Sequence, residues 1–521
     1  MYYIPSWLIL SLALFLAYIY ILGKRPAPLA RLDNPRPCDI HLASINSQIY
    51  LFLILYEIYI MQKNNPRLFG TNGVRGVFGK ELTLDLVVDL SYSLATYFEK
   101  GPIIIGYDGR KSSPILSKIV CSVINSAGID VGNARLVPTP CLQYATKRLG
   151  YNGGIMITAS HNPPEYNGIK PIANDGVEIS REDELKVEDI YYSKKFSKSD
   201  DSFGRDFRDE TIIDSYVDAV LSLVDVEKIR QRKFTVAMDI GNGVQARIAP
   251  FLLNKLGCKV ITINGNIDGD FPGRGSEPTP ENLKILSNMV KDLEADFGVA
   301  YDGDGDRSLF CDEKGKVHWG DMVGAAIVRY LLKTKHRSAE VVCPINTTMA
   351  VSLVAKEADS KVIYTKVGSV EVSREMLRRK SLIGLEENGG FMYGKLNEVR
   401  DGAMTTALVL EMLSLSNKEQ QTLSQIISSL PKIFQYKTKF RCPTKQIANK
   451  VVTICLEHGS PKKIETLDGA KIWIDEETWI MIRPSGTEPL VRMYAESTDS
   501  SLLNSKVAEY SRLIESKITM I

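Results

Sequence analysis

Short apolar runs alternate with longer amphipathic stretches along the chain from Met61 onward. Buried strands are predicted over residues 103–106, 154–157, 234–238 and 297–300, and each of them runs into a polar loop that carries Gly or Asp. This alternation is typical of α/β domains with mostly parallel sheets. Because such sheets bind ligands beyond the carboxyl ends of their strands, we expect the functional groups to lie in these loops.

The N-terminal region has a different pattern. Residues 2–22 are almost wholly apolar and match the ~20 residues that a helix needs to cross a bilayer. Lys24 and Arg25 follow directly, which predicts that the rest of the chain lies on the cytoplasmic side. A second apolar run at residues 49–60 is too short to span. Translation that begins at Met61 is the alternative, and it would remove both runs.

Length and composition indicate a multidomain globular protein. A chain of 521 residues predicts about three or four domains. A formal net charge of +2 with 24% charged residues gives no indication of a nucleic-acid partner. The 8 cysteines are far apart and lack metal-ligand spacing, so we expect reduced thiols in a cytoplasmic enzyme.

Polar, Ser-rich or charged stretches mark the predicted boundaries between domains. The predicted segments are 1–60 (apolar extension), 61–210 (domain 1), 211–315 (domain 2), 316–425 (domain 3) and 426–521 (domain 4).

The loop after the strand at residues 154–157 presents a serine, Ser160, before two prolines that stiffen a turn. A Ser/His/Asn cluster also occurs in ordinary turns. The G-x-S-x-G elbow of a hydrolase is absent, and His161 is adjacent in sequence to Ser160 and therefore poorly placed to be its base.

The loop after the strand at residues 297–300 carries Asp302, Asp304 and Asp306 at alternating positions, separated by glycines. Converging carboxylates favour a hard cation such as Mg²⁺, particularly where a phosphate oxygen completes the shell. An EF-hand would need Gly where the chain has Arg307, and a strand rather than a helix precedes the loop. An aspartyl nucleophile has no supporting pattern beyond the carboxylates themselves.

Two further loops contain groups suited to a sugar phosphate. Residues 483–489 combine an arginine, two hydroxyls and a glycine, the parts of an anion-binding nest, and Arg492 follows. Residues 384–390 place carboxylate and amide groups beside glycines, as a loop that bonds sugar hydroxyls requires. No nucleotide-binding P-loop occurs, so the phosphate must come from the substrate or from the protein itself.

Taken in order, these loops resemble the α-D-phosphohexomutase family, which includes phosphoglucomutase, phosphomannomutase and phosphoglucosamine mutase, and the chain looks like an archaeal-type member. Further matches lie at residues 69–76, 106–110, 167–170 and 400–402. The resemblance implies an α/β fold of four domains around a central cleft, three of them similar and the fourth a smaller C-terminal α+β domain.

The resemblance also implies roles for individual residues. They are Ser160 as the phosphoserine; Arg75, His161, Lys170 and Arg307 as further catalytic groups; Glu386, Asn388, Lys366, Arg483, Ser485, Gly486, Thr487 and Arg492 as substrate-binding groups; and Ser160, Asp302, Asp304 and Asp306 as Mg²⁺ ligands. Many bacterial relatives carry His where this chain has Gly390, and that His is a candidate proton carrier there. The proton carrier therefore stays open between Lys170 and His161.

The function implied is interconversion of hexose 1-phosphate and hexose 6-phosphate with Mg²⁺, with a hexose 1,6-bisphosphate as intermediate and activator. A phosphomannomutase/phosphoglucomutase is the first expectation and a phosphoglucosamine mutase the alternative. A non-catalytic sugar-phosphate binding protein is the alternative from another class. We expect a cytoplasmic monomer or homodimer, held at a membrane only if residues 2–22 are part of the native protein.

Overall fold

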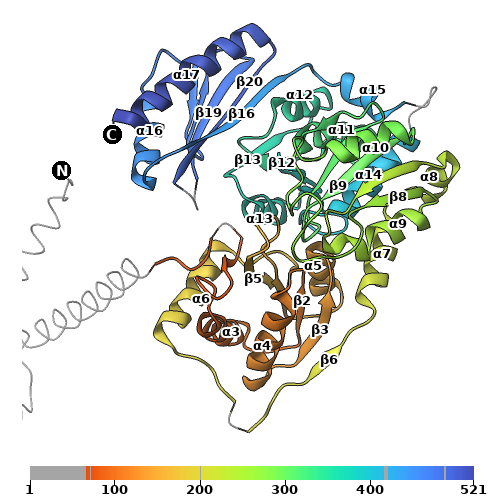
Figure 1. Ribbon diagram of the computed structural model, residues 1–521, viewed down its shortest axis with the longest axis vertical. Coiled ribbons are helices and arrows are strands. Elements are labelled where there is room, and N and C mark those ends of the chain that lie inside the picture. Colours follow the sequence, from red (N-terminus) through yellow and green to blue (C-terminus); the bar gives the residue numbers. More distant parts are fainter. Residues whose placement is uncertain (1–65, 71, 200, 416–420, 486–488, 521) are drawn as a thin grey trace, which may run out of the picture. The chain divides into compact units, whose positions relative to one another are not determined.

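The computed structural model describes residues 66–70, 72–199, 201–415, 421–485 and 489–520, and residues 67–521 form one compact unit (Figure 1). Within this described part, none of the helices is both long and apolar enough to cross a membrane. The span predicted at residues 2–22 and the alternative start at Met61 lie outside the described residues.

Four sheets follow one another along this unit, with strand orders β1-β5-β4-β2-β3-β6, β11-β10-β9-β7-β8, β13-β12-β14-β15 and β16-β20-β19-β18-β17. The four strands predicted from apolar runs are present as β2, β4, β7 and β9. In each of the first three sheets a parallel centre carries an antiparallel strand or hairpin at one edge.

The first sheet is built on runs such as Ile103-Ile104-Ile105, which are buried on both faces because helices cover both sides. Its elements are β1 (Val74–Val77), α3 (Leu84–Phe98), β2 (Ile103–Tyr107), α4 (Ser113–Ser126), β3 (Val131–Leu136), α5 (Thr139–Arg148), β4 (Gly153–Ile157), β5 (Tyr166–Ala173), α6 (Arg181–Ser193) and β6 (Asp206–Arg208).

Two helices, α7 and α8, precede the second sheet in the chain, and they pack against helices of the first and third sheets. Its elements are α7 (Ile212–Ser222), α8 (Val226–Arg232), β7 (Thr235–Asp239), the 3-10 helix η1 (Val244–Arg247), α9 (Ala249–Lys255), β8 (Lys259–Ile263), α10 (Lys284–Asp292), β9 (Phe297–Tyr301), β10 (Ser308–Asp312) and β11 (Val317–His318).

The third sheet is smaller. Its helix α14 has almost every residue buried, as expected of a helix that is apolar on all sides. Its elements are α11 (Gly320–Thr334), β12 (Val341–Pro344), α12 (Met349–Glu357), β13 (Val362–Thr365), α13 (Ser369–Arg379), β14 (Ile383–Leu385), β15 (Phe391–Tyr393), α14 (Gly402–Ser414) and α15 (Leu423–Ser428).

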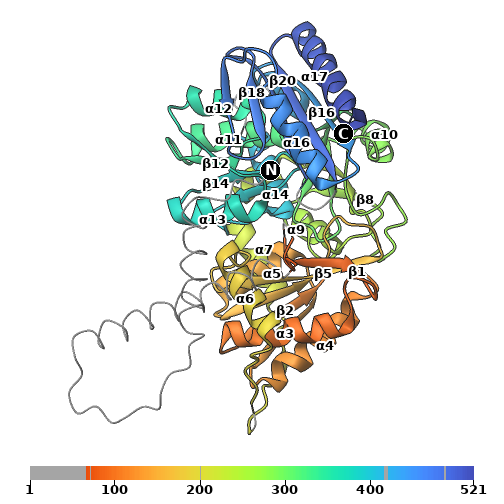
Figure 2. The same cartoon turned by 90° about the vertical axis from the view of Figure 1, so that its left-hand side faces the viewer.

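The C-terminal sheet is antiparallel throughout, and α16 and α17 pack against it on the same face (Figures 1 and 2). Alternate residues of its strands turn toward these helices, and the other face of the sheet carries both polar groups and a small apolar cluster that includes Trp479. The elements are β16 (Phe434–Arg441), α16 (Lys445–Leu456), β17 (Lys463–Glu465), β18 (Ala470–Trp473), β19 (Thr478–Pro484), β20 (Leu490–Ser497) and α17 (Ser500–Met520).

The apolar cores divide the unit in two. One continuous cluster runs through the first three sheets and includes Leu142 on α5, Val217 on α7, Leu252 on α9 and Leu408 on α14. The C-terminal sheet has a cluster of its own between its strands and its two helices.

Candidate active site

Ser160 lies in the loop that leaves the carboxyl end of β4, with a left-handed backbone at φ 52°. This conformation is uncommon for a residue with a side chain, and it persists only where neighbours hold it. Here the Ser160 amide donates to Thr158 Oγ1 at 2.8 Å, and the Thr158 hydroxyl donates to Asp108 at 2.7 Å. The turn therefore presents the Ser160 side chain in a fixed direction.

Arg110 holds the same loop through hydrogen bonds to its backbone. Its buried guanidinium donates to the carbonyls of Ser160 at 2.8 Å, Asn162 at 2.6 Å and Pro163 at 2.5 Å. Asp108 balances its charge at 3.1 Å. Buried charges that are paired and fully hydrogen-bonded rigidify their surroundings, so this arginine holds the shape of the serine loop.

The Ser160 hydroxyl contacts two groups that suit phosphoryl chemistry. Its Oγ donates to Asp302 Oδ2 at 3.1 Å and lies 3.2 Å from His161 Nδ1. The expectation that His161 is poorly placed because it is adjacent in sequence is therefore wrong on geometry, since the left-handed turn at Ser160 brings the two side chains together. Burial and the charges of Arg307 and Arg75 lower the pKa of His161 well below its ordinary value, which favours the neutral imidazole.

Asp302, Asp304 and Asp306 form a buried cluster in the loop between β9 and β10, and each offers a ligand atom within 4.8 Å of the others. Burial, together with the charges of Asp306 and Asp304, raises the pKa of Asp302 well above its ordinary value. Asp304 Oδ1 and Asp306 Oδ1 are buried without a hydrogen-bond partner among the described residues. Converging buried oxygens without partners fit a divalent cation.

Thr139, the first residue of α5, holds Asp304 in two ways. Its amide donates to the Asp304 carbonyl at 3.0 Å and its hydroxyl to Asp304 Oδ2 at 2.7 Å. Although burial acts to raise the pKa of Asp304, the nearby Lys170 charge and this hydroxyl lower it below its ordinary value. The first sheet therefore positions part of the carboxylate cluster of the second.

Three cationic side chains predicted to be catalytic converge on this region. Lys170 is buried, with Nζ 3.6 Å from Asp304 and 3.8 Å from Asp306. Arg307 Nε lies 3.8 Å from carboxylate oxygens of both Asp302 and Asp306. These contacts place positive charge on two sides of the carboxylate cluster.

Arg75, on β1, donates through Nη1 to the Ala159 carbonyl at 3.2 Å and to Asn162 at 3.1 Å. Its Nη2 is buried without a hydrogen-bond partner in the described part of the chain. Burial lowers the pKa of Arg75 to about 10, which leaves it charged at neutral pH. An unpartnered, charged N–H group beside the serine loop is suited to bind a phosphate oxygen.

The predicted sugar loop lies between β14 and β15. Glu386 is buried and accepts a hydrogen bond from Arg400 Nη1 at 3.2 Å, while the other end of Arg400 pairs with Asp306. Asn388 is half-buried, and its side-chain oxygen accepts from the Gly390 amide at 3.3 Å. Arg400 thus links the carboxylate cluster to the sugar loop.

The predicted phosphate loop begins at the end of β19. Arg483 and Arg492 are direct partners across β19 and β20, and Lys439 on β16 is the partner of Arg492 on its other side. Residues opposite one another in an antiparallel sheet share a face, so three cations form one row. Ser485 is buried, and its amide donates to the Leu490 carbonyl at 2.9 Å. Gly486 and Thr487 lie outside the described residues.

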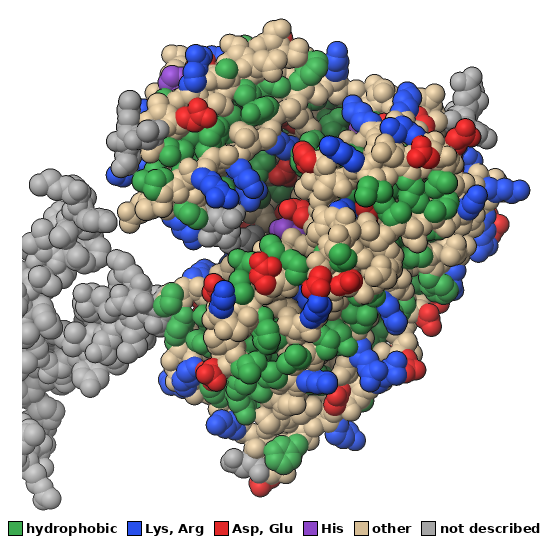
Figure 3. Space-filling model, in the orientation of Figure 1, with side chains coloured by type: hydrophobic (Ala, Val, Ile, Leu, Met, Phe, Trp, Pro, Cys, Tyr) green, Lys and Arg blue, Asp and Glu red, His purple; other side chains and the backbone are tan. Residues whose placement is uncertain are grey.

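Lys366 follows β13 and is exposed. The next amide, of Val367, donates to Asp468 at 2.9 Å, and Asp468 also pairs with Arg483 at 3.1 Å. The segment that carries Lys366 is thus tied to the phosphate loop. Figure 3 shows a hollow in one face of the molecule, with acidic, basic and histidine side chains at its walls.

Comparison with known proteins shows what this constellation belongs to. Family models of the phosphoglucomutase/phosphomannomutase α/β/α domains I, II and III match residues 66–198, 214–315 and 319–434, and the model of the C-terminal domain matches residues 440–512. The chain belongs to the phosphoglucomutase/phosphomannomutase family. The fold class and the enzyme class expected from the sequence, a four-domain phosphohexomutase, are thereby confirmed.

Individual relatives of this family are similar over most of the chain. A phosphoglucosamine/phosphogalactosamine mutase of Sulfurisphaera tokodaii is 40% identical over 87% of this chain and 100% of its own length. A phosphoglucomutase/phosphomannomutase of Thermococcus kodakarensis is 39% identical over 86% of this chain and 97% of its own length. The crystal structure of a family member from Burkholderia thailandensis superposes with a TM-score of 0.77 at 23% identity, over 87% of this chain and 97% of that one.

Gly390, the position at which we expect a histidine in many bacterial relatives, lies close to Arg400. A Cβ atom at Gly390 would lie 2.4 Å from Cδ of Arg400, a distance that no side chain tolerates. The bridge that Arg400 makes between Asp306 and Glu386 therefore occupies the space that a histidine at position 390 would need.

Sequence reasoning gave no role to three residues that the structure places in the site: Arg110, Arg400 and Lys439. The first two lie in segments that resemble the family, Gly106–Arg110 and Arg400–Gly402, and an arginine with an Asp one or two residues away was the available signal. Lys439 lies in no motif. Only its register opposite Arg492 identifies it.

Proposed function

We propose that this phosphohexomutase interconverts hexose 1-phosphate and hexose 6-phosphate through phosphorylated Ser160. The observation that carries the proposal is the contact of Ser160 Oγ with Asp302 at 3.1 Å, within a ring of cationic side chains. A hydroxyl so placed can hold a phosphoryl group whose charge its surroundings balance, and positioning with charge neutralisation does most of the work of phosphoryl transfer.

In the proposed reaction a free hydroxyl of the hexose phosphate attacks phosphorus, and the bond from phosphorus to Ser160 Oγ breaks. The product is a hexose 1,6-bisphosphate, which reorients and returns its other phosphoryl group to Ser160. Asp302, Asp304, Asp306 and the seryl oxygen would hold Mg²⁺, which neutralises charge on the transferring phosphoryl group when bound. Arg75, Lys170 and Arg307 would orient the phosphoryl oxygens.

The attacking hydroxyl must lose a proton, and Ser160 must regain one when its phosphoryl group leaves. His161 is the proposed carrier because its Nδ1 already lies 3.2 Å from the seryl oxygen. Lys170 is the alternative carrier, since it is buried beside the same carboxylates. Glu386 and Asn388 would bind sugar hydroxyls, and Lys366 would bind the substrate from the segment that is tied to the phosphate loop.

The row of cations on the C-terminal sheet would bind the phosphate that does not react. Arg483, Arg492 and Ser485 would contact it together with Gly486 and Thr487. Like charges placed opposite one another repel, so a row of this kind gains most from an anion. A site that recognises charge rather than shape accepts either end of the reoriented bisphosphate.

Mannose and glucose phosphates are the proposed substrates, as the sugar loop and the name of the Thermococcus relative suggest. Glucosamine phosphate is the second candidate, because the Sulfurisphaera relative is named for amino sugars at nearly the same identity. Initial rates on the three 1-phosphates, with Mg²⁺ and a trace of the matching 1,6-bisphosphate, rank them. A binding protein without activity would convert none.

Ser160→Ala tests the nucleophile. Ser122→Ala, a change of the same kind on an exposed turn of α4, is the matched control. We expect Ser160→Ala to lose turnover by more than about a thousandfold while both variants unfold like the wild type. Mass spectrometry of the wild type after incubation with bisphosphate should find one phosphate on the peptide that carries Ser160. Wild-type turnover by Ser160→Ala would refute the phosphoserine mechanism.

A further inference from the structure

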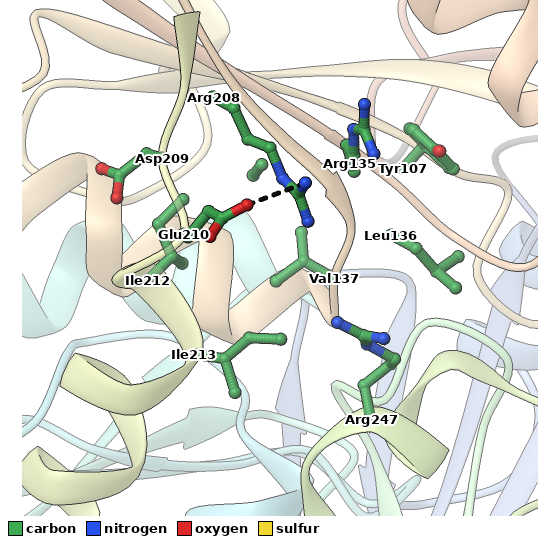
Figure 4. Close-up of a pocket in the computed structure, with 11 residues that line it drawn as sticks. Tyr107, Arg135, Leu136, Val137, Arg208, Asp209, Glu210, Ile212, Ile213 and Arg247 are labelled. Atoms are coloured by element: carbon green, nitrogen blue, oxygen red, sulfur yellow. Dashed lines mark ion pairs between the residues drawn. The ribbon is translucent and has the colours of Figure 1, made fainter.

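A second cavity, of about 360 Å³, lies where the first and second sheets meet. Figure 4 shows its walls. Leu136, Val137, Ile212 and Ile213 supply an apolar side, with Tyr107 beside them. A volume in this range, with an apolar wall and a few polar groups, is typical of a small-molecule site.

Three arginines reach this cavity from three separate elements: Arg135 on β3, Arg208 on β6 and Arg247 on η1 (Figure 4). Arg208 pairs with Glu210 at 2.7 Å. Arg135 and Arg247 have no ion-pair partner among the residues that the structure describes. Guanidinium groups that line one cavity favour a phosphate or another planar or tetrahedral anion.

The acidic residues of the wall do not cancel this charge. Asp209 accepts hydrogen bonds from the Tyr151 hydroxyl at 2.8 Å and from the Thr211 hydroxyl at 2.7 Å. These hydroxyls are neutral, so Asp209 keeps its negative charge, and Glu210 pairs with Arg208. Three arginines against two carboxylates leave the wall with a net positive charge, and the guanidinium groups of Arg135 and Arg247 stay available to a ligand.

Arg135 follows a β-bulge and has an unusual backbone conformation. The pairing of β2 with β3 shifts register, so that Ile105 opposes Asn133 and Gly106 opposes Arg135, and Ala134 is bulged out. Arg135 has a left-handed φ of 56°, and its amide donates to Asn133 Oδ1 at 3.0 Å. Bulges re-aim side chains, and strained backbone is maintained mostly where a function uses it.

The cavity is distinct from the family's catalytic machinery. Arg208, Asp209, Glu210, Ile212 and Ile213 lie in the stretch between residues 198 and 214, which neither the domain I model nor the domain II model matches. This part of the wall therefore lies in the connection between the two matched domains.

Two wall segments nevertheless continue directly into the active site. Two residues after Val137, Thr139 holds Asp304 of the carboxylate cluster. One residue after Tyr107, Asp108 holds Thr158 of the serine loop. The Val137 amide donates to the Tyr107 carbonyl at 3.1 Å, so the two segments are themselves joined. A ligand in the cavity would contact both wall segments, and through them it would act on the carboxylate cluster and on the serine loop together.

We propose that this cavity binds the phosphate or diphosphate group of a small phosphorylated molecule and thereby regulates turnover. The guanidinium groups of Arg135, Arg247 and Arg208 hold the anion, and the apolar wall receives the rest of the ligand. The ligand bridges the first and second sheets and changes the position of Thr139 and Asp108. Binding is independent of the proposed function, whereas the effect on turnover rests on it.

Inorganic pyrophosphate in metal-free buffer is the probe for binding, measured by calorimetry. Arg492→Ala is introduced first, so that the row of cations on the C-terminal sheet binds pyrophosphate less tightly. Within this background, Arg135→Gln/Arg247→Gln removes the two unpaired charges. Arg148→Gln/Arg337→Gln, at two exposed arginines that do not line the cavity, removes the same net charge.

We expect the Arg492→Ala protein to retain one pyrophosphate site, and the Arg135/Arg247 pair to weaken that site at least about tenfold. The control pair should leave its affinity unchanged. Absence of the retained site overturns the proposal. So does equal binding by the Arg135/Arg247 variant, or equal weakening by the control pair.

Turnover provides the second measurement, with Arg492 intact. At saturating hexose phosphate and excess Mg²⁺, pyrophosphate should change kcat of the wild type, and the Arg135→Gln/Arg247→Gln enzyme should keep its basal kcat without the response. An effect on KM alone that survives in this variant means that pyrophosphate acts at the active site only, which overturns the regulatory role. An enzyme without any turnover would instead refute the proposed function and leave the calorimetric result to decide the site.

Discussion

The first three sheets and the C-terminal sheet contribute to one site but are built differently. A single apolar cluster joins the first three, whereas the C-terminal sheet has a separate core. The proposed nucleophile Ser160, the carboxylates and the flanking cations all lie in the joined part, and the row of cations proposed to bind phosphate lies on the separate one. Phosphoryl transfer needs fixed distances between the reacting groups. A phosphate site that accepts either end of a reoriented sugar gains from some freedom to move.

Polar contacts and one small apolar cluster join these two regions. Glu387 pairs with Lys437 at 2.5 Å, and Lys471 donates to the Ile345 carbonyl at 2.8 Å. A small apolar cluster that includes Trp479 and Met349 lies between them. Changes in the joined region should therefore affect chemistry, and changes on the C-terminal sheet should affect binding.

Asp302→Asn should have the largest effect, because it removes a proposed Mg²⁺ ligand in the joined region. We expect turnover to fall by about a thousandfold or more. The raised pKa of Asp302 means that its ionised form disfavours the folded state, and this cost grows as pH rises from the ordinary carboxyl value toward the folded-state value. Without metal at pH 8, the variant should therefore gain about 1 kcal/mol in the free energy of unfolding.

Rates and urea unfolding in EDTA measure the two effects of Asp302→Asn. Asp292→Asn, at an exposed position on α10, is the matched control and should change neither. Added Mg²⁺ should stabilise the wild type by mass action and the variant much less. A variant that turns over normally, or that gains as much from Mg²⁺ as the wild type, would contradict the assignment of Asp302 as a ligand.

Arg492→Ala should act on binding instead. Loss of charge-assisted hydrogen bonds to phosphate, worth about 1.5 to 3 kcal/mol, should raise KM about 10- to 100-fold with a smaller change in kcat. Stability should be unchanged or slightly higher, because Arg483 loses a like charge opposite it. Initial rates and urea unfolding check this, with the exposed Arg512→Ala as control. An effect confined to kcat would mean that the C-terminal sheet shares in the chemistry.

The sequence predicted the elements that depend on local pattern. Fully apolar runs identified β2, β4, β7 and β9, and the loops at their carboxyl ends contain Ser160 and Asp302. The order of the loops identified the family and its four domains. These features depend on residues close together in the chain, where periodicity and motif spacing carry the information.

Contacts across long sequence separations could not be predicted in the same way. Thr139 holds Asp304 from 165 residues away, and Arg400 reaches Asp306 from 94 residues away. Lys439 joins the phosphate row only through strand register. Adjacency to Ser160 predicts a poor position for His161, and the left-handed backbone at Ser160 that brings the two side chains together has no signal in the sequence. Tertiary packing determines all of these, and one sequence contains no direct record of it.

Glu387→Gln tests the link between the two regions. The pair with Lys437 is mostly buried, with side chains 17% and 16% exposed, so its loss leaves Lys437 with Asp321 alone at 3.9 Å. We expect a loss of about 1 to 3 kcal/mol in stability and a change of less than about tenfold in kcat/KM. A double-mutant cycle with Lys437→Met measures the coupling. Additive effects of the two changes would show that the pair does not couple the regions.

Lys439→Ala should have the smallest effect and gives the sharpest test of where the phosphate row ends. Lys439 is exposed and contributes a screened charge, so we expect KM to rise only about threefold at low salt and the difference to vanish as ionic strength increases. Lys450→Ala, which removes an exposed lysine on α16 behind the same sheet, should leave KM unchanged. Equal KM values for the two variants at low salt would confine the row to Arg483 and Arg492. A rise specific to Lys439→Ala would extend the row to β16, the strand that also carries Lys437, so that one strand would both bind the substrate's phosphate and pair with the sugar loop.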